Sequence, residues 1–408
     1  MTSAGPSFSK DRSDAKVSGR RGILCRLIDR AIPAMPAGRL HLTLPNGDII
    51  ERHGTLPGPE AIMIAHRWRG LRRMLLDGDH GFADGYLDGD WSTPELGQLL
   101  EFCMQNESAL TATAAVGRLG LLRNRLVHWL RHNTPRGSRR NIAAHYDLGN
   151  DFFRAWLDEA MNYSSALYVN CDTLERAQSA KLDRAAALLE LNGGERVLEI
   201  GCGWGALAER LIRHYGSSVF GITLSTEQLA YAQTRLAGDV ERGRAELRLQ
   251  DYRDVAGQFD RIASIEMIEA VGERYWPNYF GKIRDCLASG GVALLQAITI
   301  DERRFAAYRK CPDFIQRYIF PGGVLPTFSI IEQEAARAGL KLVHHESFGD
   351  SYVRTLREWR GRFLHAWPKL EPLGFNDRFR RMWEYYLAYC EAGFRSGSID
   401  VGFFKLTG

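Results

Sequence analysis

The stretch 197-VLEIGCGWGALAERL-211 decides the fold, because an apolar strand pattern runs directly into a glycine-rich turn and then into a helical pattern. Glycines in this turn allow the backbone to approach a ligand closely, as in nucleotide sites at the first strand-to-helix turn of such sheets. Further apolar runs alternate with helical stretches: SSVFGITLS (217–225), AELRLQDY (245–252), FDRIASIEM (259–267), GVALLQAITI (291–300) and GFFKLTG (402–408). This alternation predicts an α/β fold with a doubly wound, mostly parallel sheet.

The residues around the turn favour S-adenosylmethionine over a dinucleotide as the ligand. A bound dinucleotide usually needs a carboxylate after the second strand for its ribose hydroxyls, but that strand here ends in GITLSTEQ (221–228). Glu199 instead precedes the glycines, and Asp251 and Tyr252 follow the third strand, where they can meet an adenine ring. A turn that only packs a helix on the sheet is the less favoured alternative.

Length and cysteine pattern limit the class of protein. The 408 residues, 45% of them apolar, are enough for two or three domains. The seven cysteines are scattered without a CxxC pair or zinc-ligand spacing, which indicates a reduced, cytoplasmic protein without a metal site. Because no signal-like N-terminus and no run of about 18 apolar residues occurs, we expect a protein that neither spans a membrane nor is exported.

The positive charge is concentrated in one segment. Residues 108–146 contain no acidic residue, and arginines punctuate an apolar run that includes Trp129. Such a basic amphipathic segment suits an anionic membrane surface, although a linker helix with solvated arginines explains it about as well. The segment has no aromatic residues interleaved beyond Trp129 and matches no reader motif, so we expect no nucleic-acid partner.

These patterns divide the chain into four parts. We expect a disordered tail over 1–21, a small α+β domain over 22–110 with a hairpin at Asn46-Gly47, a basic amphipathic linker over 111–140, and a catalytic domain over 141–408.

A series of stretches between about 141 and 405 matches a known family in order: HYDLGNDFF, YSSALY, EIGCGWG, GITLSTEQ, QDYRDV, FDRIASIEMIEAVG, YIFPGG, WRGRFLHAWP and YYLAYCEAGFR. On these stretches the chain resembles the cyclopropane fatty acid synthases, including the mycolic acid cyclopropane synthases. The resemblance implies a class I S-adenosylmethionine-dependent methyltransferase that acts on unsaturated acyl chains, within membrane phospholipid in the longer bacterial members. It also implies a lipid-associating role for 22–110, a peripheral location on the inner face of the membrane, and a homodimer.

The resemblance further assigns roles to matching positions. The positions expected to line the S-adenosylmethionine site are Tyr163, Ser164, Gly201, Gly203, Thr223, Leu224, Gln228, Asp251, Tyr252 and Ile265. Glu269, Ile298 and Tyr386 match residues that hold a bicarbonate ion beside the reacting carbon. Because a carboxyl group next to an anion resists ionising, we expect Glu269 to share a proton with the bicarbonate.

Three positions depart from the family pattern. Ser165 replaces a cysteine, Gln296 stands where a histidine holds bicarbonate, and Ala270 replaces a histidine next to Glu269. A glutamine can still donate to an anion but carries no charge, so Ser165 and Gln296 stay in the expected catalytic group with a weakened bicarbonate site.

The departures bear on the product. Methyl transfer to a double bond leaves a carbocation, and loss of a proton from the new methyl group closes a cyclopropane, the product we expect. A hydride shift before proton loss would give a methylene or methyl-branched unsaturated chain instead. A non-catalytic lipid-binding relative is disfavoured by Glu269, Tyr386 and the complete glycine turn. A small-molecule methyltransferase is disfavoured by YIFPGG (318–323), which the resemblance ties to acyl chains.

Overall fold

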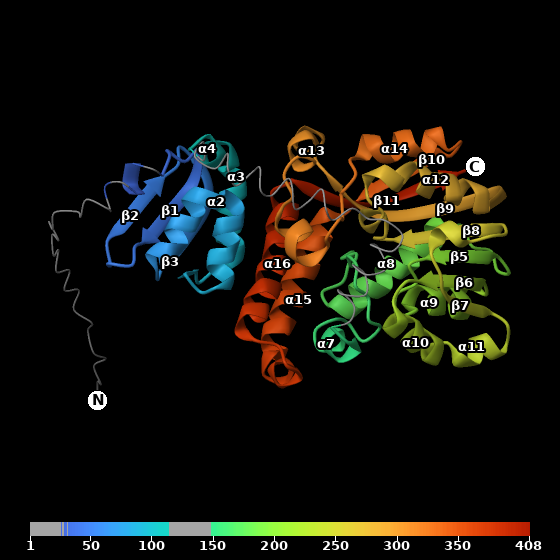
Figure 1. The fold of residues 1–408 in the computed structure, drawn as a ribbon. Helices are drawn as coiled ribbons and strands as arrows, with labels where there is room; N and C mark the ends of the chain where they lie inside the picture. The colour runs from blue at the N-terminus through green and yellow to red at the C-terminus, as the bar shows by residue number, and fades with distance from the viewer. Residues whose placement is uncertain (1–25, 27, 31, 114–147) are drawn as a thin grey trace, which may run out of the picture.

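The structure is a computed structural model that describes residues 26, 28–30, 32–113 and 148–408. These residues form two sheets with their helices, and the long helices α15 (Gly349–Leu370) and α16 (Asp377–Arg395) lie between the two sheets (Figure 1). The expected tail over 1–21 and, beyond its first three residues, the expected basic linker over 111–140 lie outside the described residues.

Residues 32–113, here called the N-terminal unit, form a four-stranded sheet with helices packed against it. The strands are β1 (Ala37–Thr43), β2 (Ile49–His53), β3 (Leu56–Ala65) and β4 (Trp91–Ser92), in the order β2-β1-β3-β4. The helices are α2 (Trp68–Leu87), α3 (Leu96–Gln105) and α4 (Glu107–Thr113). The hairpin predicted at Asn46-Gly47 is confirmed, since β1 and β2 pair antiparallel across it and Gly47 adopts a φ of 85°.

The second sheet has seven strands in the order β10-β11-β9-β8-β5-β6-β7. Its strands are β5 (Arg196–Ile200), β6 (Ser218–Thr223), β7 (Ala245–Leu249), β8 (Phe259–Ile265), β9 (Leu287–Ile300), β10 (Lys341–Ser347) and β11 (Ile399–Thr407). Strands β5 to β9 pair in parallel, whereas β11 pairs antiparallel with both β9 and β10. The predicted doubly wound, mostly parallel α/β sheet is therefore confirmed. Its strand order reverses between β5 and β8, and ligands bind at such a point.

Helices cover both faces of this sheet (Figure 1). The α-helices between residues 148 and 337 are α7 (Asn150–Arg154), α8 (Leu174–Leu188), α9 (Ala206–Tyr215), α10 (Thr226–Arg235), α11 (Ala237–Glu241), α12 (Trp276–Cys286), α13 (Glu302–Tyr308) and α14 (Phe328–Arg337). Neighbouring residues of β5 belong to different cores: Val197 lies in the same core as Leu211 of α9, and Leu198 in the same core as Phe280 of α12. Within the described part of the chain, no helix is long and apolar enough to cross a bilayer.

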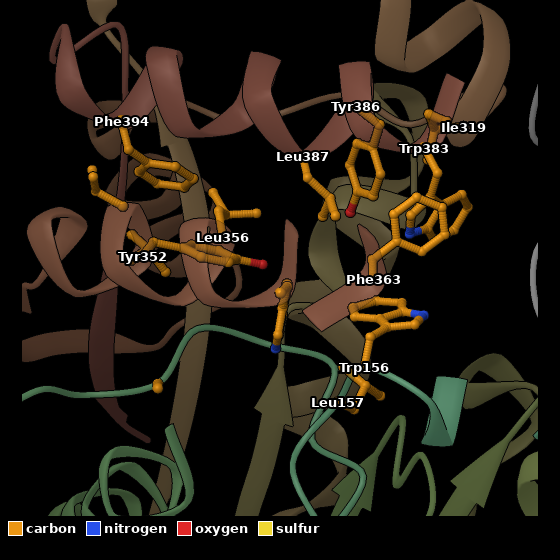
Figure 2. Packing of buried hydrophobic residues seen from close by; sticks show 14 of the residues in the cluster. Trp156, Leu157, Ile319, Tyr352, Leu356, Phe363, Trp383, Tyr386, Leu387 and Phe394 are labelled. Atoms are coloured by element: carbon orange, nitrogen blue, oxygen red, sulfur yellow. The ribbon is translucent and has the colours of Figure 1, made fainter. Parts of the chain in front are cut away.

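Aromatic side chains fill the space where α15 and α16 face each other (Figure 2). Trp156 and Trp383 are fully buried with ring centroids 5.9 Å apart, and Trp383 lies 5.3 Å from the ring of Tyr386 in an edge-on arrangement. Such contacts hold large rings in fixed orientations. Figure 2 shows that the Tyr386 hydroxyl points from α16 toward α15.

A buried ion-pair cluster joins the N-terminal unit to these helices. The carboxylate of Glu391 on α16 is 2% exposed and lies 3.0 Å from Arg360 and 2.5 Å from Arg395. Arg395 also lies 3.0 Å from Glu101 of α3. Removal of one partner from such a cluster leaves buried charges uncompensated.

We therefore expect the substitution Glu391→Gln to lower the free energy of unfolding by about 3 kcal/mol, as breaking a buried pair does. Glu358→Gln is the matched control, because Glu358 pairs with Arg362 on α15 but its side chain is 47% exposed. The control should cost less than about 1 kcal/mol. Urea unfolding of both variants checks this, and equal losses would contradict it.

Candidate active site

A cavity of about 890 Å³ lies at the carboxyl ends of the parallel strands. The glycine turn after β5, the end of β6 and the residues that follow β8 form one part of its wall. Tyr352 of α15 and Tyr386 of α16 line it from the helices, and Asp79 and His80 line it from the N-terminal unit. One cavity thus joins the expected nucleotide end of the sheet to the aromatic helices.

The glycine turn is shaped by three glycines with positive φ. Gly201, Gly203 and Gly205 have φ of 85°, 52° and 84°, values that other residues rarely adopt. A Cβ on Gly205 would lie 3.2 Å from Ala232 Cβ, whereas a Cβ on Gly203 would meet nothing within 4 Å. Gly203 lines the cavity, so its open side faces the space in which a ligand would lie.

Unsatisfied polar atoms surround this end of the cavity. Within the described residues, Glu199 Oε2 and the Tyr252 hydroxyl are buried without a hydrogen-bond partner, and both residues line the cavity. Burial raises the pKa of Glu199 to about 8. Thr223 Oγ1 donates to Gln228 Oε1 at 2.9 Å beside them. Buried polar groups in proteins normally have partners, so these atoms fit a polar ligand such as S-adenosylmethionine.

The structure brings together all but one of the positions expected to bind the cofactor. Those that line the cavity are Tyr163, Ser164, Gly201, Gly203, Thr223, Leu224, Gln228, Tyr252 and Ile265. Asp251 does not line it, because its carboxylate accepts hydrogen bonds of 2.8 Å and 2.6 Å from the guanidinium of Arg253. Their individual contacts with the cofactor stay predictions.

Of the expected catalytic residues, Glu269, Ile298 and Tyr386 line the cavity. Glu269 Oε1 accepts a 2.6 Å hydrogen bond from the backbone N–H of Ile298, and Glu269 Oε2 has no partner among the described residues. Burial, with the nearby charge of Glu266, raises the pKa of Glu269 to about 8. The Tyr386 hydroxyl lies 2.8 Å from the hydroxyl of Tyr163. Glu269 is therefore a neutral carboxylic acid at neutral pH.

Ser165 and Gln296 are fully buried behind the cavity wall, and both contact Glu266. The backbone N–H of Ser165 donates to Glu266 Oε1 at 2.8 Å, and Gln296 Nε2 donates to the same oxygen at 2.7 Å. The hydroxyl of Tyr352 donates to Glu266 Oε2 at 2.7 Å. Glu266 lines the cavity, so these groups hold its carboxylate at the wall.

Sequence reasoning missed Glu266 and Lys181. Lys181 of α8 is buried, lines the cavity and donates to Ser164 Oγ at 2.7 Å. Burial lowers its pKa to about 8, against the charges of Glu266, Asp158 and Glu199. A carboxylate directly after the apolar run FDRIASI (259–265) was a signal for Glu266, because such side chains meet at the carboxyl edge of the sheet.

The residues present do not fit a bicarbonate ion. The donors expected to hold it already have partners within the protein: Gln296 donates to Glu266, the Ile298 N–H donates to Glu269, and the Tyr386 hydroxyl shares a hydrogen bond with the hydroxyl of Tyr163. An anion would also lie beside two buried carboxyl groups, and like charges there are unfavourable. The glycine turn and its unsatisfied polar atoms, in contrast, do fit S-adenosylmethionine.

We expect the substitution Gly203→Ala to weaken binding of S-adenosylhomocysteine about tenfold or more, because the added methyl group enters the ligand space. Gly216→Ala is the matched control, since Gly216 has a φ of 66° at the end of α9 and does not line the cavity. Both variants carry a similar backbone penalty of about 1 kcal/mol. Calorimetric titration checks this, and equal affinities in the two variants would contradict it.

The raised pKa of Glu269 predicts a pH dependence of stability. The folded state keeps a proton on this carboxyl up to a pKa of about 8, whereas the ordinary value is 4.5. The folded state thus binds more protons between these values, and the free energy of unfolding falls as pH rises through them. In Glu269→Gln this fall should be less steep, by about 1.4 kcal/mol per pH unit. Urea unfolding without ligand at several pH values measures both slopes, and identical slopes would show that Glu269 ionises normally.

Known proteins are similar to this chain in sequence and in fold. The family model described as mycolic acid cyclopropane synthetase matches residues 133–404. Tuberculostearic acid methyltransferase UfaA1 of Mycobacterium tuberculosis is 42% identical over 83% of this chain and 81% of that protein. Cyclopropane-fatty-acyl-phospholipid synthase of Escherichia coli is 36% identical over 81% of this chain and 84% of that protein.

A solved structure supports the same assignment. Mycolic acid cyclopropane synthase CmaA1, complexed with S-adenosylhomocysteine and CTAB, aligns with a TM-score of 0.62 at 32% identity and covers 66% of this chain and 98% of that one. The chain belongs to the mycolic acid cyclopropane synthetase family and is an S-adenosylmethionine-dependent methyltransferase.

Proposed function

We propose that the protein transfers a methyl group from S-adenosylmethionine to the double bond of an unsaturated fatty acyl chain in a membrane phospholipid. The observation that carries this proposal is the single cavity that runs from the glycine turn to the aromatic helices. A double bond is a weak nucleophile, so it must be held in line with the methyl donor, away from water. A cavity with a polar end at the glycine turn and aromatic side chains from α15 and α16 in its wall meets that need.

The aromatic wall suits the cationic chain that methyl transfer leaves behind. Tyr163, Tyr352 and Tyr386 line the cavity, and the ring of Tyr163 lies 5.4 Å from that of Phe153. Ring faces attract a cation, most strongly where water is excluded. We therefore assign Tyr163 and Tyr386 to stabilisation of the cation.

The rim of the cavity fits a phospholipid headgroup. Arg303 and Lys310 line the cavity and are exposed, so cationic groups stand where the cavity meets solvent. Leu75 and Leu76 of α2 are each 50% exposed, and they precede the cavity-lining residues Asp77 to His80. Exposed apolar side chains beside cations suit the surface of an anionic membrane. These features support a lipid-associating role for the N-terminal unit and a peripheral location of the protein at the membrane. The homodimer that the family resemblance implies is part of the same proposal.

A cyclopropane fatty acid is the first product we propose, and a methylene or methyl-branched unsaturated chain is the second. The methyl-branching relative UfaA1 favours the second. The name of the Escherichia coli relative favours the first. Both products follow from one methyl transfer: loss of a proton from the new methyl group closes the ring, whereas the unsaturated chain needs a hydride shift before a proton is lost.

Expression in a bacterium that lacks its own cyclopropane synthase tests the proposal. Cells fed methyl-labelled methionine are expected to contain labelled phospholipid acyl chains, which mass spectrometry with double-bond derivatisation assigns to a product. A labelled saturated ring identifies the first product, and a labelled chain that keeps a double bond identifies the second. Absence of label in lipid, with protein that binds S-adenosylhomocysteine, would overturn the lipid substrate. The same cells without the gene are the control.

A further inference from the structure

Glu266 has an unfavourable backbone conformation at the point where a ligand binds. It directly follows β8, which lies next to β5 and its glycine turn, and its φ is 48°. A residue with a side chain at such a φ costs about 1 kcal/mol, a cost that glycine avoids. Strained residues of this kind gather at active sites, where the surrounding structure holds them in place. The position of Glu266 therefore calls for a role that its side chain performs.

The contacts of the two neighbouring carboxyl groups differ in a way that assigns their charge. Three donors reach Glu266, namely the Ser165 N–H, Gln296 Nε2 and the Tyr352 hydroxyl, at 2.8, 2.7 and 2.7 Å. For Glu269, the Ile298 N–H donates to Oε1 at 2.6 Å, and Oε2 has no partner among the described residues. Hydrogen bonds to a carboxylate favour its charged form. Of the pair, Glu266 therefore holds the negative charge and Glu269 the proton.

The surroundings of Glu266 suit proton transfer. Burial raises its pKa above the ordinary value, while the three donors and the charge of Lys181 oppose that rise. A carboxylate that is ionised yet more basic than usual is an effective general base near neutral pH.

One departure from the family pattern lies directly at this carboxylate. Gln296, which stands where a histidine holds bicarbonate, donates its amide N–H to Glu266 Oε1. The backbone N–H of Ser165 donates to the same oxygen, while the Ser165 hydroxyl donates to the carbonyl of Ala166. A glutamate side chain ends in the same planar O–C–O group that bicarbonate presents. The protein thus supplies from its own chain the group that a bound ion would otherwise bring, and it carries matching donors for that group.

We propose that the carboxylate of Glu266 is the base that removes the proton after methyl transfer, in place of bicarbonate. A bond forms between the donor methyl carbon and one alkene carbon as the carbon–sulfur bond breaks, and its electron pair stays on sulfur. The other alkene carbon becomes the cation. Glu266 then takes a proton from carbon, and the released electron pair closes the ring or forms a new double bond. The proton passes to water after the products leave.

This inference rests on the proposed methyl transfer to lipid, so the assay includes the wild-type protein. Purified protein is mixed with methyl-labelled S-adenosylmethionine and vesicles of monounsaturated phosphatidylglycerol, in buffer freed of carbon dioxide, with and without added bicarbonate. The variants are Glu266→Gln, which keeps the shape without the charge, and Glu266→Gly, which suits the φ of 48°. Glu334→Gln is the matched control, because Glu334 of α14 is also buried but does not line the cavity.

The wild-type protein should methylate lipid at the same rate with and without bicarbonate. Glu266→Gln should lose about 100-fold or more of this rate, the contribution of a general base, and still bind S-adenosylhomocysteine. Glu266→Gly should lose as much and regain part of the rate with bicarbonate, since its removal frees the donors of Ser165 and Gln296. Glu334→Gln should keep the wild-type rate.

Two results would overturn the role of Glu266 and leave the proposed function standing. One is a wild-type rate that depends on added bicarbonate, and the other is a Glu266→Gln variant as fast as wild type. If Glu266→Gln does not bind S-adenosylhomocysteine, the rescue of Glu266→Gly decides, and absence of rescue counts against the base. A wild-type protein that binds S-adenosylhomocysteine but methylates no lipid overturns the proposed function and this inference together. That outcome is distinct from the others because it appears before any variant is compared.

Discussion

The balance of charge in one cavity is the constraint on which the site depends. Glu199, Glu266 and Glu269 line it, and among the described residues Lys181 is a buried cation that lines it with them. Buried charges are costly without partners, and the cavity meets this cost by retaining protons, since the pKa values of Glu199 and Glu269 are each raised to about 8. A sulfonium donor brings a permanent positive charge into this space. The negative charge that remains therefore suits the methyl donor first and the cationic chain after it, whereas the neutral sulfur of the spent donor is held less strongly.

The wall of the cavity is assembled from parts of the chain that lie far apart. Arg304 of α13 lies 2.6 Å from Glu107 of α4, and the hydroxyl of Tyr318 donates to Asp84 of α2. These contacts bring the N-terminal unit against the segment YIFPGG (318–323). That unit thus contributes part of the cavity wall as well as exposed apolar surface, and its packing influences both the shape of the cavity and its access.

The sequence predicts local features of this protein well, because they depend on neighbouring residues. The strand before Gly201, the parallel sheet and the turn at Asn46-Gly47 all follow from short patterns. The family resemblance also points to most residues that line the cofactor end of the cavity. What the sequence does not show is which distant groups share a hydrogen bond.

Glu266 illustrates that limit. Its donors come from residues 165, 296 and 352, and no pattern within one segment connects them. The departures at Ser165 and Gln296 are visible in the sequence, but their common acceptor appears only in three dimensions. Asp251 is the opposite case. Its position at a strand end predicts a ligand contact, but its carboxylate accepts hydrogen bonds from the nearby Arg253 instead.

The order of strands also bears on how the chain folds. β11 lies between β9 and β10, so the pairing of Thr407 with Val292 spans more than a hundred residues, and α15 and α16 both lie in the intervening chain. Pairings between distant residues form slowly. The edge strand β10 reaches the rest of the sheet only through β11. The edge of the sheet and the aromatic packing of α15 and α16 beside the cavity therefore depend on the same long-range pairing, so the cavity reaches its final form only when β11 has joined β9.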